Sequence, residues 1–217
     1  MKSPIVTIVL ALGLAANVLL LAWSVSSFRI PGNQQGYEPE QPIAYSHRLH
    51  AGELQIQCLY CHSNADRSRH AGIPAAGICM NCHSVVTASL GAVRAEDELA
   101  AKEKRPPRPI VSPELQKLYS TLALDANRKP DPAGKLTPIA WNRVHNLPDF
   151  AYFDHRPHVK LGVACQRCHG PVETMERMRQ HSDLSMGWCV NCHREVNRTG
   201  VGGKTVNASL DCSACHF

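Results

Sequence analysis

Five Cys-x-x-Cys-His motifs constrain this 217-residue chain more than any other feature, because they contain all ten of its cysteines. In this pattern the two thiols bond to the vinyl groups of a haem, and the histidine that follows binds its iron from the proximal side. Ten cysteines in an exported chain also suffice for disulfides or zinc sites, but neither requires a histidine after every second cysteine. We therefore predict five haem c groups. The attachment residues are Cys58, Cys61, Cys79, Cys82, Cys165, Cys168, Cys189, Cys192, Cys212 and Cys215, and the proximal iron ligands are His62, His83, His169, His193 and His216.

The N-terminal segment predicts a membrane anchor at residues 1–28. No charged residue lies between Lys2 and Arg29, and the apolar stretch 5–27 exceeds the roughly 20 residues that a membrane-spanning helix needs. We expect this anchor to remain uncleaved, as a single pass in a bacterial cytoplasmic membrane. The positive charge of Lys2 favours a cytoplasmic N-terminus, which places the haem motifs on the periplasmic side.

Composition limits both the partners and the fold. The net charge is +5, and the basic residues are scattered rather than gathered in a stripe, so we predict no nucleic-acid binding. Phe, Trp and Tyr make up only 6% of the chain, which leaves few large side chains for a core. We predict a mostly irregular chain with short α-helices wrapped around haem, little or no sheet, and one N-terminal transmembrane helix.

An internal repeat organises the region after the anchor. Each copy has an aromatic residue, a His-x-x-His pair and then two haem motifs, and the second copy continues to a third motif. The repeated segments are Tyr45-Ser-His47-Arg-Leu-His50 and Phe153-Asp-His155-Arg-Pro-His158. The predicted domains are therefore a two-haem module at 29–92 and a three-haem module at 141–217, joined by a linker at 93–140.

The linker predicts one short amphipathic helix. Ser112 offers an N-cap, Pro113 suits the first helical position, and leucines follow at helical spacing to about Leu124. Charged helix formers at 95–104 precede the proline-rich stretch 105–109, which interrupts a helix. Two roles stay open for the linker: a solvated connection or a docking arm for a partner subunit.

The two modules resemble the small multihaem cytochromes of the c3 and c7 families. The resemblance covers residues 45–83 and 153–216 and rests on His-x-x-His followed by Cys-x-x-Cys-His. It implies distal iron ligands for four haems. The implied pairs of distal and proximal histidines are His47 with His62, His50 with His83, His155 with His169, and His158 with His193.

The fifth haem, held by His216, has no obvious distal ligand in this pattern. The chain departs from the three-haem families because no histidine stands four residues before Cys189. A methionine thioether in this position would raise the haem potential. The candidates are Met175, Met186, His181 and His145. If they are not ligands, His70 and His145 are expected to hydrogen-bond to haem propionates or to backbone.

The whole chain resembles the membrane-anchored pentahaem cytochromes of alternative complex III. The residues that carry this resemblance are the anchor and the stretches 45–52, 79–83, 141–150 and 186–194. It implies a quinol-oxidising complex with a multispanning quinol-binding membrane subunit, a peripheral iron–sulfur subunit and a monohaem cytochrome c. The chain is then an electron-transfer subunit and not an enzyme by itself.

Two other classes of function share part of this pattern. A self-sufficient quinol dehydrogenase, of the kind that feeds periplasmic nitrite or nitrate reductases, also has one anchor and four or five haems. A terminal multihaem reductase needs one five-coordinate haem, and the surplus of histidines argues against it. The direction of electron flow and the spatial order of the haems do not follow from the sequence.

Overall fold

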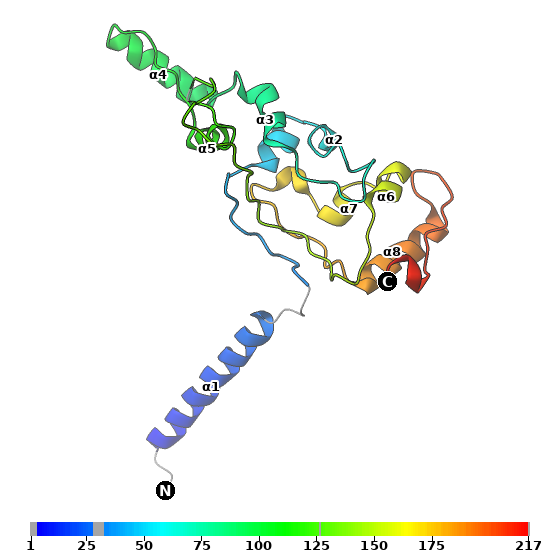
Figure 1. Cartoon of the computed structure of the whole chain (residues 1–217). Coiled ribbons are helices and arrows are strands. Elements are labelled where there is room, and N and C mark those ends of the chain that lie inside the picture. The colour runs from blue at the N-terminus through cyan, green and yellow to red at the C-terminus, as the bar shows by residue number, and fades with distance from the viewer. Residues whose placement is uncertain (1–3, 28–32, 126, 217) are drawn as a thin grey trace.

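The computed structural model describes residues 4–27, 33–125 and 127–216, and this part of the chain contains helices, turns and irregular segments but no β-strand (Figure 1). The predicted fold class, a mostly irregular chain with short helices, is confirmed. The helices are α1 (Pro4–Ser27), η1 (Arg48–Glu53), α2 (Cys58–Cys61), α3 (Ala76–His83), α4 (Leu90–Lys102), α5 (Pro113–Thr121), α6 (His155–Leu161), α7 (Gln166–His169), η2 (Val172–Thr174), α8 (Met186–Thr199) and η3 (Cys212–Ala214).

Helix α1 is the predicted membrane anchor. Its mean hydropathy over Pro4–Val25 is 2.6, none of that stretch is buried, and Figure 1 shows the helix apart from the body. Length and composition are those of a membrane-spanning helix, criteria that a signal sequence also meets. The amide of Asn17 donates to the carbonyl oxygen of Gly13 at 2.8 Å, so this polar group is satisfied within the helix. Lys2 and Arg29, which set the predicted orientation, lie outside the described residues.

The segment between the modules contains two helices, α4 and α5, where the sequence predicted one. The predicted N-cap of α5 is confirmed, because the Ser112 hydroxyl accepts a hydrogen bond from Leu115 N at 3.3 Å. The helix ends at Thr121 rather than near Leu124, since Ala123 adopts a left-handed φ of 53°. Residues 89–124, called the arm here, point away from the body in Figure 1.

The chain that leaves α4 is tied back to it by Glu96. The Glu96 carboxylate accepts from the Arg105 guanidinium at 2.5 Å and from the backbone N–H of Arg108 at 2.7 Å. Only 10% of the Glu96 side chain and 19% of the Arg105 side chain are exposed. The Glu96–Arg105 pair therefore holds the proline-rich stretch 105–109 against α4, the helix that precedes it.

The two modules pack together through η1 and η2. Arg48 N donates to the carbonyl oxygen of Met175 at 2.9 Å, and the Arg48 guanidinium contacts the Glu176 carboxylate at the same distance. Gly52 approaches Glu173 so closely that a Cβ at residue 52 would lie 2.3 Å from the Glu173 carbonyl oxygen. The segment that carries both predicted distal histidines of the first module is thus fixed on the second module.

Gln180 is fully buried and joins two distant segments to its own. Its carbonyl oxygen accepts from Gly36 N at 2.7 Å, and its backbone N–H donates to Tyr37 O at 3.0 Å. Its side-chain oxygen accepts from Asn146 N at 3.2 Å, and its side-chain nitrogen donates to Ser182 O at 3.1 Å. The segment after the anchor is therefore threaded between two stretches of the second module.

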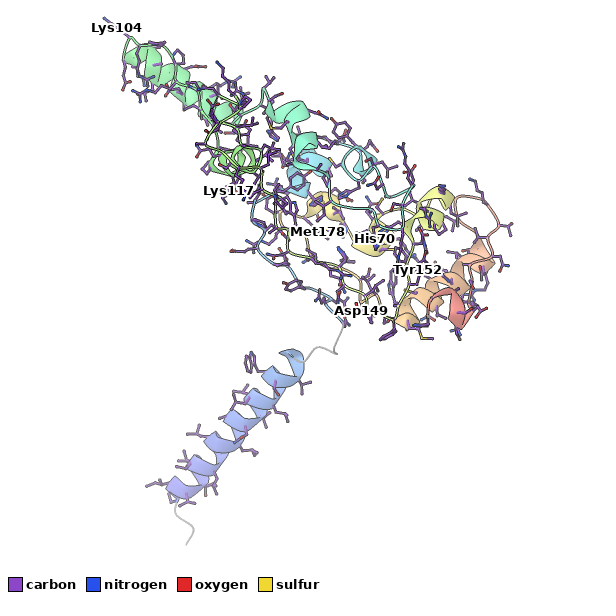
Figure 2. All side chains as sticks on the ribbon, viewed as in Figure 1. His70, Lys104, Lys117, Asp149, Tyr152 and Met178 are labelled. Carbon is purple, nitrogen blue, oxygen red and sulfur yellow. The ribbon has the colours of Figure 1, made fainter. Side chains whose placement is uncertain are left out.

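The described residues bury few apolar side chains of their own. Three of them, Ala100, Leu118 and Tyr119, belong to the arm, and the body contributes Ala65, Val144 and Met175. The side chains of the body and the arm are drawn in Figure 2. A body with so small a core agrees with the expectation that attached haem completes it.

Candidate haem-attachment sites

The five motifs lie on α2, α3, α7, α8 and η3, or at the ends of these elements. Side chains three and four positions apart share one helical face, so both thiols and the histidine of a motif point the same way. None of the ten cysteines forms a disulfide. In the described part of the chain, no group of three or more His, Cys, Asp or Glu side chains is arranged to hold a metal ion, whereas tetrahedral zinc needs four ligands.

Four proximal histidines are oriented by backbone carbonyl groups. In each, Nδ1 donates to a carbonyl oxygen, which leaves Nε2 unprotonated and free to bind a metal. The contacts are His62 to Gly72 O at 2.8 Å, His83 to Val86 O at 2.7 Å, His193 to Ser209 O at 2.6 Å and His216 to Phe150 O at 3.3 Å.

The remaining proximal histidine, His169 of the third motif, has a different hydrogen-bond partner. Its Nδ1 lies 3.1 Å from Nε2 of His145, and the two rings are 4.4 Å apart at an angle of 80°. Burial lowers the pKa of His145 to about 4, and burial followed by the charge of His145 lowers the pKa of His169 to about 3, so both rings are neutral near pH 7. The sequence left His145 open as a ligand of the fifth haem, but its Nε2 faces another histidine.

The predicted internal repeat is reproduced in three dimensions. Tyr45 meets His47 edge-on, with ring centroids 4.9 Å apart at 84°, and stacks on His50 at 4.5 Å and 25°. Phe153 repeats this arrangement with the histidines of the second copy, at 4.8 Å and 82° for the first and 4.8 Å and 34° for the second. In both copies, the aromatic ring thus holds the two histidines in fixed orientations.

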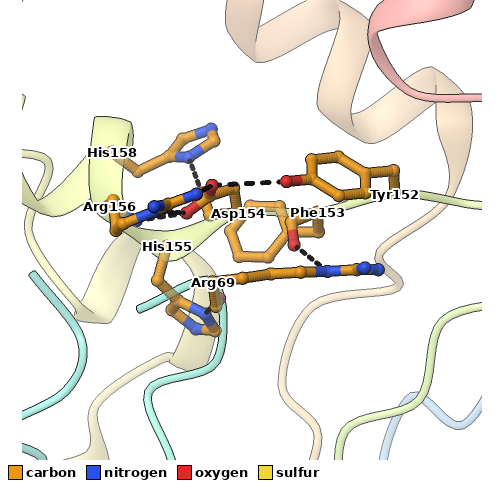
Figure 3. A network of polar contacts seen from close by, with 7 residues as sticks. All are labelled: Arg69, Tyr152, Phe153, Asp154, His155, Arg156 and His158. Carbon is orange, nitrogen blue, oxygen red and sulfur yellow. Dashed lines mark hydrogen bonds and ion pairs between the residues drawn. The ribbon is translucent and has the colours of Figure 1, made fainter. Parts of the chain in front are cut away.

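Hydrogen bonds orient three of the four predicted distal histidines. Nδ1 donates to a backbone carbonyl oxygen in His50 (Ser46 O, 2.9 Å), His155 (Arg69 O, 2.9 Å) and His158 (Asp154 O, 2.8 Å), the last two drawn in Figure 3. Each of these rings therefore keeps Nε2 free. Nδ1 of His47 is buried and has no hydrogen-bond partner among the described residues.

The predicted distal and proximal rings face each other in pairs. Ring centroids are 6.1 Å apart for His50 and His83, 6.4 Å for His155 and His169, and 6.1 Å for His158 and His193. A metal–imidazole bond is about 2 Å long, and each centroid lies roughly 1 Å behind its nitrogen, so two rings on opposite sides of one iron are about 6 Å apart. The spacing fits haem, while the ligation itself stays a prediction.

The remaining predicted pair, His47 and His62 of the first site, is close enough to interact electrostatically. Burial, and then the neighbouring charge of His62, lowers the pKa of His47 to about 4. A ring that stays neutral in this way is suited to metal binding. The unpartnered Nδ1 is the feature that separates His47 from the other distal candidates.

The five attachment sites are numbered by their order in the sequence. Side-chain contacts show which sites are neighbours in space. The second and first sites meet where the Asn81 amide donates to the Tyr60 hydroxyl at 3.0 Å. The first and third sites lie close together at Cys58 and Cys165, and this proximity, after burial, raises the pKa of Cys165. The contact between these two cysteines joins the modules.

The third and fourth sites meet where Arg167 pairs with Glu195, which links α7 to α8. The fourth and fifth sites are near each other, because His193 of the fourth site donates its Nδ1 proton to Ser209 O, three residues before Cys212, at 2.6 Å. Burial and then the Cys215 thiol raise the pKa of Cys189. Figure 1 shows α3, α2, α7 and α8 following one another across the body. The sites therefore form one series: second, first, third, fourth and fifth.

An apolar cavity of about 700 Å³ lies beside the second site. Its wall includes Ala76, the first residue of α3, and Leu122, which follows α5. Ile139 and Trp141 line it from the chain that enters the second module.

The candidates for the distal ligand of the fifth haem lie in different places. Met175 is buried and bonded through its carbonyl oxygen to Arg48, in the segment of the first site. His181 lies against Gly170, where a Cβ would be 2.3 Å from the His181 ring, and so belongs near the third site. Met186 is 67% exposed and begins α8.

Three residues of the site were missed by the sequence. The Arg69 carbonyl accepts from both N and Nδ1 of His155, at 3.1 and 2.9 Å, and its guanidinium lies over the Tyr152 ring at 4.1 Å. The Tyr119 hydroxyl donates to the carbonyl oxygen of His83 at 2.6 Å, and Gln180 joins the segments described above. No local pattern predicts these contacts, because each partner lies far away in the sequence.

His70, a histidine that the sequence left without a ligand role, lies near the centre of the body in Figure 2 and is exposed.

Comparison with known proteins agrees with this geometry. Residues 151–217 match the family of cytochrome c7 and related cytochromes c. The chain is also 25% identical over 199 residues, 82% of its length, to a Nitratidesulfovibrio vulgaris (strain Hildenborough) protein named "Menaquinone reductase, multiheme cytochrome c subunit", of which the alignment covers 78%. The chain thus contains a cytochrome c7-like domain, of the kind that binds haem c covalently, at residues 151–217.

Proposed function

We propose that the chain is a pentahaem electron-transfer subunit of a membrane complex, passing electrons from quinol oxidation to a monohaem cytochrome c or an oxidase. The observation that carries this proposal is the unbroken series of attachment sites. Haem c supplies reversible one-electron chemistry when bound. Where the chain's own side chains take both axial positions, no substrate site remains, so the chain is not an enzyme by itself.

The proposed axial ligands follow from the paired histidines. His47, His50, His155 and His158 are the distal ligands of the first, second, third and fourth sites, opposite His62, His83, His169 and His193. For the fifth site, opposite His216, we infer Met186. It lies one turn before Cys189, the thiol that neighbours Cys215, whereas the other candidates are held at the first and third sites.

The anchor supports a partner-dependent role. We propose that α1 spans the bacterial cytoplasmic membrane with its N-terminus in the cytoplasm and the attachment sites on the periplasmic side. Quinol oxidation needs a pocket within the membrane and a route for protons. Asn17, near the middle of α1, is bonded within its own helix, so one helix of this kind offers too little for a quinol site.

A multispanning subunit is therefore the proposed quinol-binding partner. A peripheral iron–sulfur subunit and a monohaem cytochrome c complete the assembly that the resemblance to alternative complex III implies. The second candidate function is electron delivery in the opposite direction, to menaquinone. It is favoured by the printed name of the Nitratidesulfovibrio vulgaris relative, a menaquinone reductase subunit.

Purification from the native membrane tests the proposal. We expect an intact mass with five added haems, co-purification of a multispanning subunit, and haem reduction by menaquinol in the complex but not in the isolated chain. Rapid reduction of the isolated chain by menaquinol would overturn the proposal in favour of a self-sufficient dehydrogenase. Menaquinone reduction by the complex, with no reduction by menaquinol, would support the second candidate.

The order of the sites can be tested by removing one of them. Replacing Cys58 and Cys61 by serine removes the first site and separates the second from the other three. Menaquinol added to the complex should then reduce either one haem or three, but not all four that remain. The matched control removes the terminal fifth site through Cys212 and Cys215, which leaves the other four contiguous. Equal reduction of four haems in both variants would contradict the order.

A further inference from the structure

Among the five proximal histidines, only His169 donates its Nδ1 proton to another side chain. In the other four, the acceptor is a backbone carbonyl oxygen. The acceptor of His169 is Nε2 of His145, at 3.1 Å. Because His169 must keep Nε2 unprotonated to bind iron, its Nδ1 carries the proton and His145 is the acceptor. The third site therefore has an environment that the other sites lack.

His145 is held in place independently of His169. The preceding residue, Val144, is buried, and the following one, Asn146, donates its backbone N–H to the fully buried Gln180 at 3.2 Å. The carbonyl oxygen of His145 accepts from the Arg143 guanidinium at 3.0 Å. The imidazole thus approaches His169 from a fixed backbone, and its position does not depend on the ligand it contacts.

An imidazole nitrogen is a stronger base than a peptide carbonyl oxygen. A stronger acceptor at Nδ1 draws the proton away from His169 and makes its Nε2 more electron-rich. A more electron-rich axial ligand stabilises ferric over ferrous iron and so lowers the potential of the haem it holds. The third site lies in the middle of the series, where its potential affects transfer in both directions.

We propose that His145 is a positioning residue of the third site, which orients His169 and lowers the potential of the haem attached at Cys165 and Cys168. This inference rests on haem attachment as proposed above. It differs from the roles that the sequence left open for His145, because His145 contacts a proximal ligand rather than iron or propionate. Its effect acts through one hydrogen bond.

The test compares His145→Ala with His145→Gln in the full-length chain. The alanine variant has no acceptor, while the glutamine oxygen replaces the imidazole nitrogen by a carbonyl like those at the other four sites. We expect His145→Ala to keep five low-spin haems and to change the ferric-to-ferrous ratio of one of them about tenfold at fixed potential, or about 59 mV upward. His145→Gln should restore part of the shift.

Redox titration followed by electron paramagnetic resonance measures both the potential and the low-spin signal of each haem. The control is Lys102→Ala, which removes an exposed side chain at the end of α4, outside every attachment site, and should leave all five potentials unchanged. Unchanged potentials in His145→Ala would overturn the proposal. One haem turning high-spin would also overturn it, since His145 would then be an axial ligand.

Mass measurement separates the two levels of inference. Wild-type protein without haem at Cys165 and Cys168 would contradict the proposed function itself. Loss of the third haem in both His145 variants, with normal loading in wild type, would make His145 a structural residue and overturn only its role in tuning. Five haems with one shifted potential support both.

Discussion

Replacing Gly52 by alanine tests the packing that joins the two modules. The added Cβ would lie 2.3 Å from the carbonyl oxygen of Glu173, and backbone atoms occupy the position, so η1 and η2 must separate by about 0.7 Å to reach a 3.0 Å contact. Overpacking of this kind costs about 1–3 kcal/mol of the free energy of unfolding. For a chain of this size, each kcal/mol lowers Tm by about 2–4 °C.

Thermal unfolding of the haem-loaded protein, followed by haem absorbance, measures the change. The matched control is Gly77→Ala in α3, where a Cβ meets no atom within 4 Å. That variant should melt at the wild-type temperature or gain up to about 1 kcal/mol, because alanine favours helix more than glycine does. A Gly52→Ala protein that melts like the control would refute the proposed junction of the modules.

Single contacts at three other places also yield measurable predictions. Tyr119→Phe removes the donor to His83 O and should lower the unfolding free energy by about 1 kcal/mol in urea denaturation. Gln180→Leu leaves a part-buried donor at Asn146 and a buried acceptor at Ser182 unpaired and should cost about 1–3 kcal/mol in the same assay. The Arg105 hydrogen bond lowers the pKa of Glu96 from 4.5 to about 2, so this carboxylate stabilises the arm above pH 4.5 and the effect is lost as pH falls toward 2. Hydrogen-exchange protection of α4 should fall over that range in wild type, and should be low and insensitive to pH there in Glu96→Gln.

The sequence predicted the features that depend on short-range spacing. The N-cap at Ser112 and the repeat of an aromatic residue followed by a His-x-x-His pair both follow from residues a few positions apart. Their geometry needs little help from the rest of the fold. The apolar run of α1 was predictable for the same reason, because a membrane helix satisfies its backbone within itself.

Contacts between distant residues were beyond the same reasoning. The sequence analysis placed His145 among the candidate iron ligands, because a sequence identifies a histidine but does not show which residue its ring contacts. The extension of α4 back to Leu90 was missed, because the interpretation rested on the charged helix formers at 95–104, while the helix begins after an N-cap at Ser89. No sequence motif marks the Arg69 carbonyl as the acceptor for His155. That contact forms only when the two modules pack together.

The two copies of the repeat share their internal geometry but not their surroundings. His50 and His158 donate to the carbonyl four residues earlier in both copies, so these contacts are built into the repeated segment. The first histidine of each pair depends on the other module: His155 donates to Arg69 O, whereas His47 has no partner for Nδ1 among the described residues. Because the Nδ1 hydrogen bond sets ligand basicity, identical ligand sets at the first and third sites need not give equal potentials. The asymmetric surroundings of the two copies thus allow the proposed haem sites to differ in potential, although the repeated segments share their internal geometry.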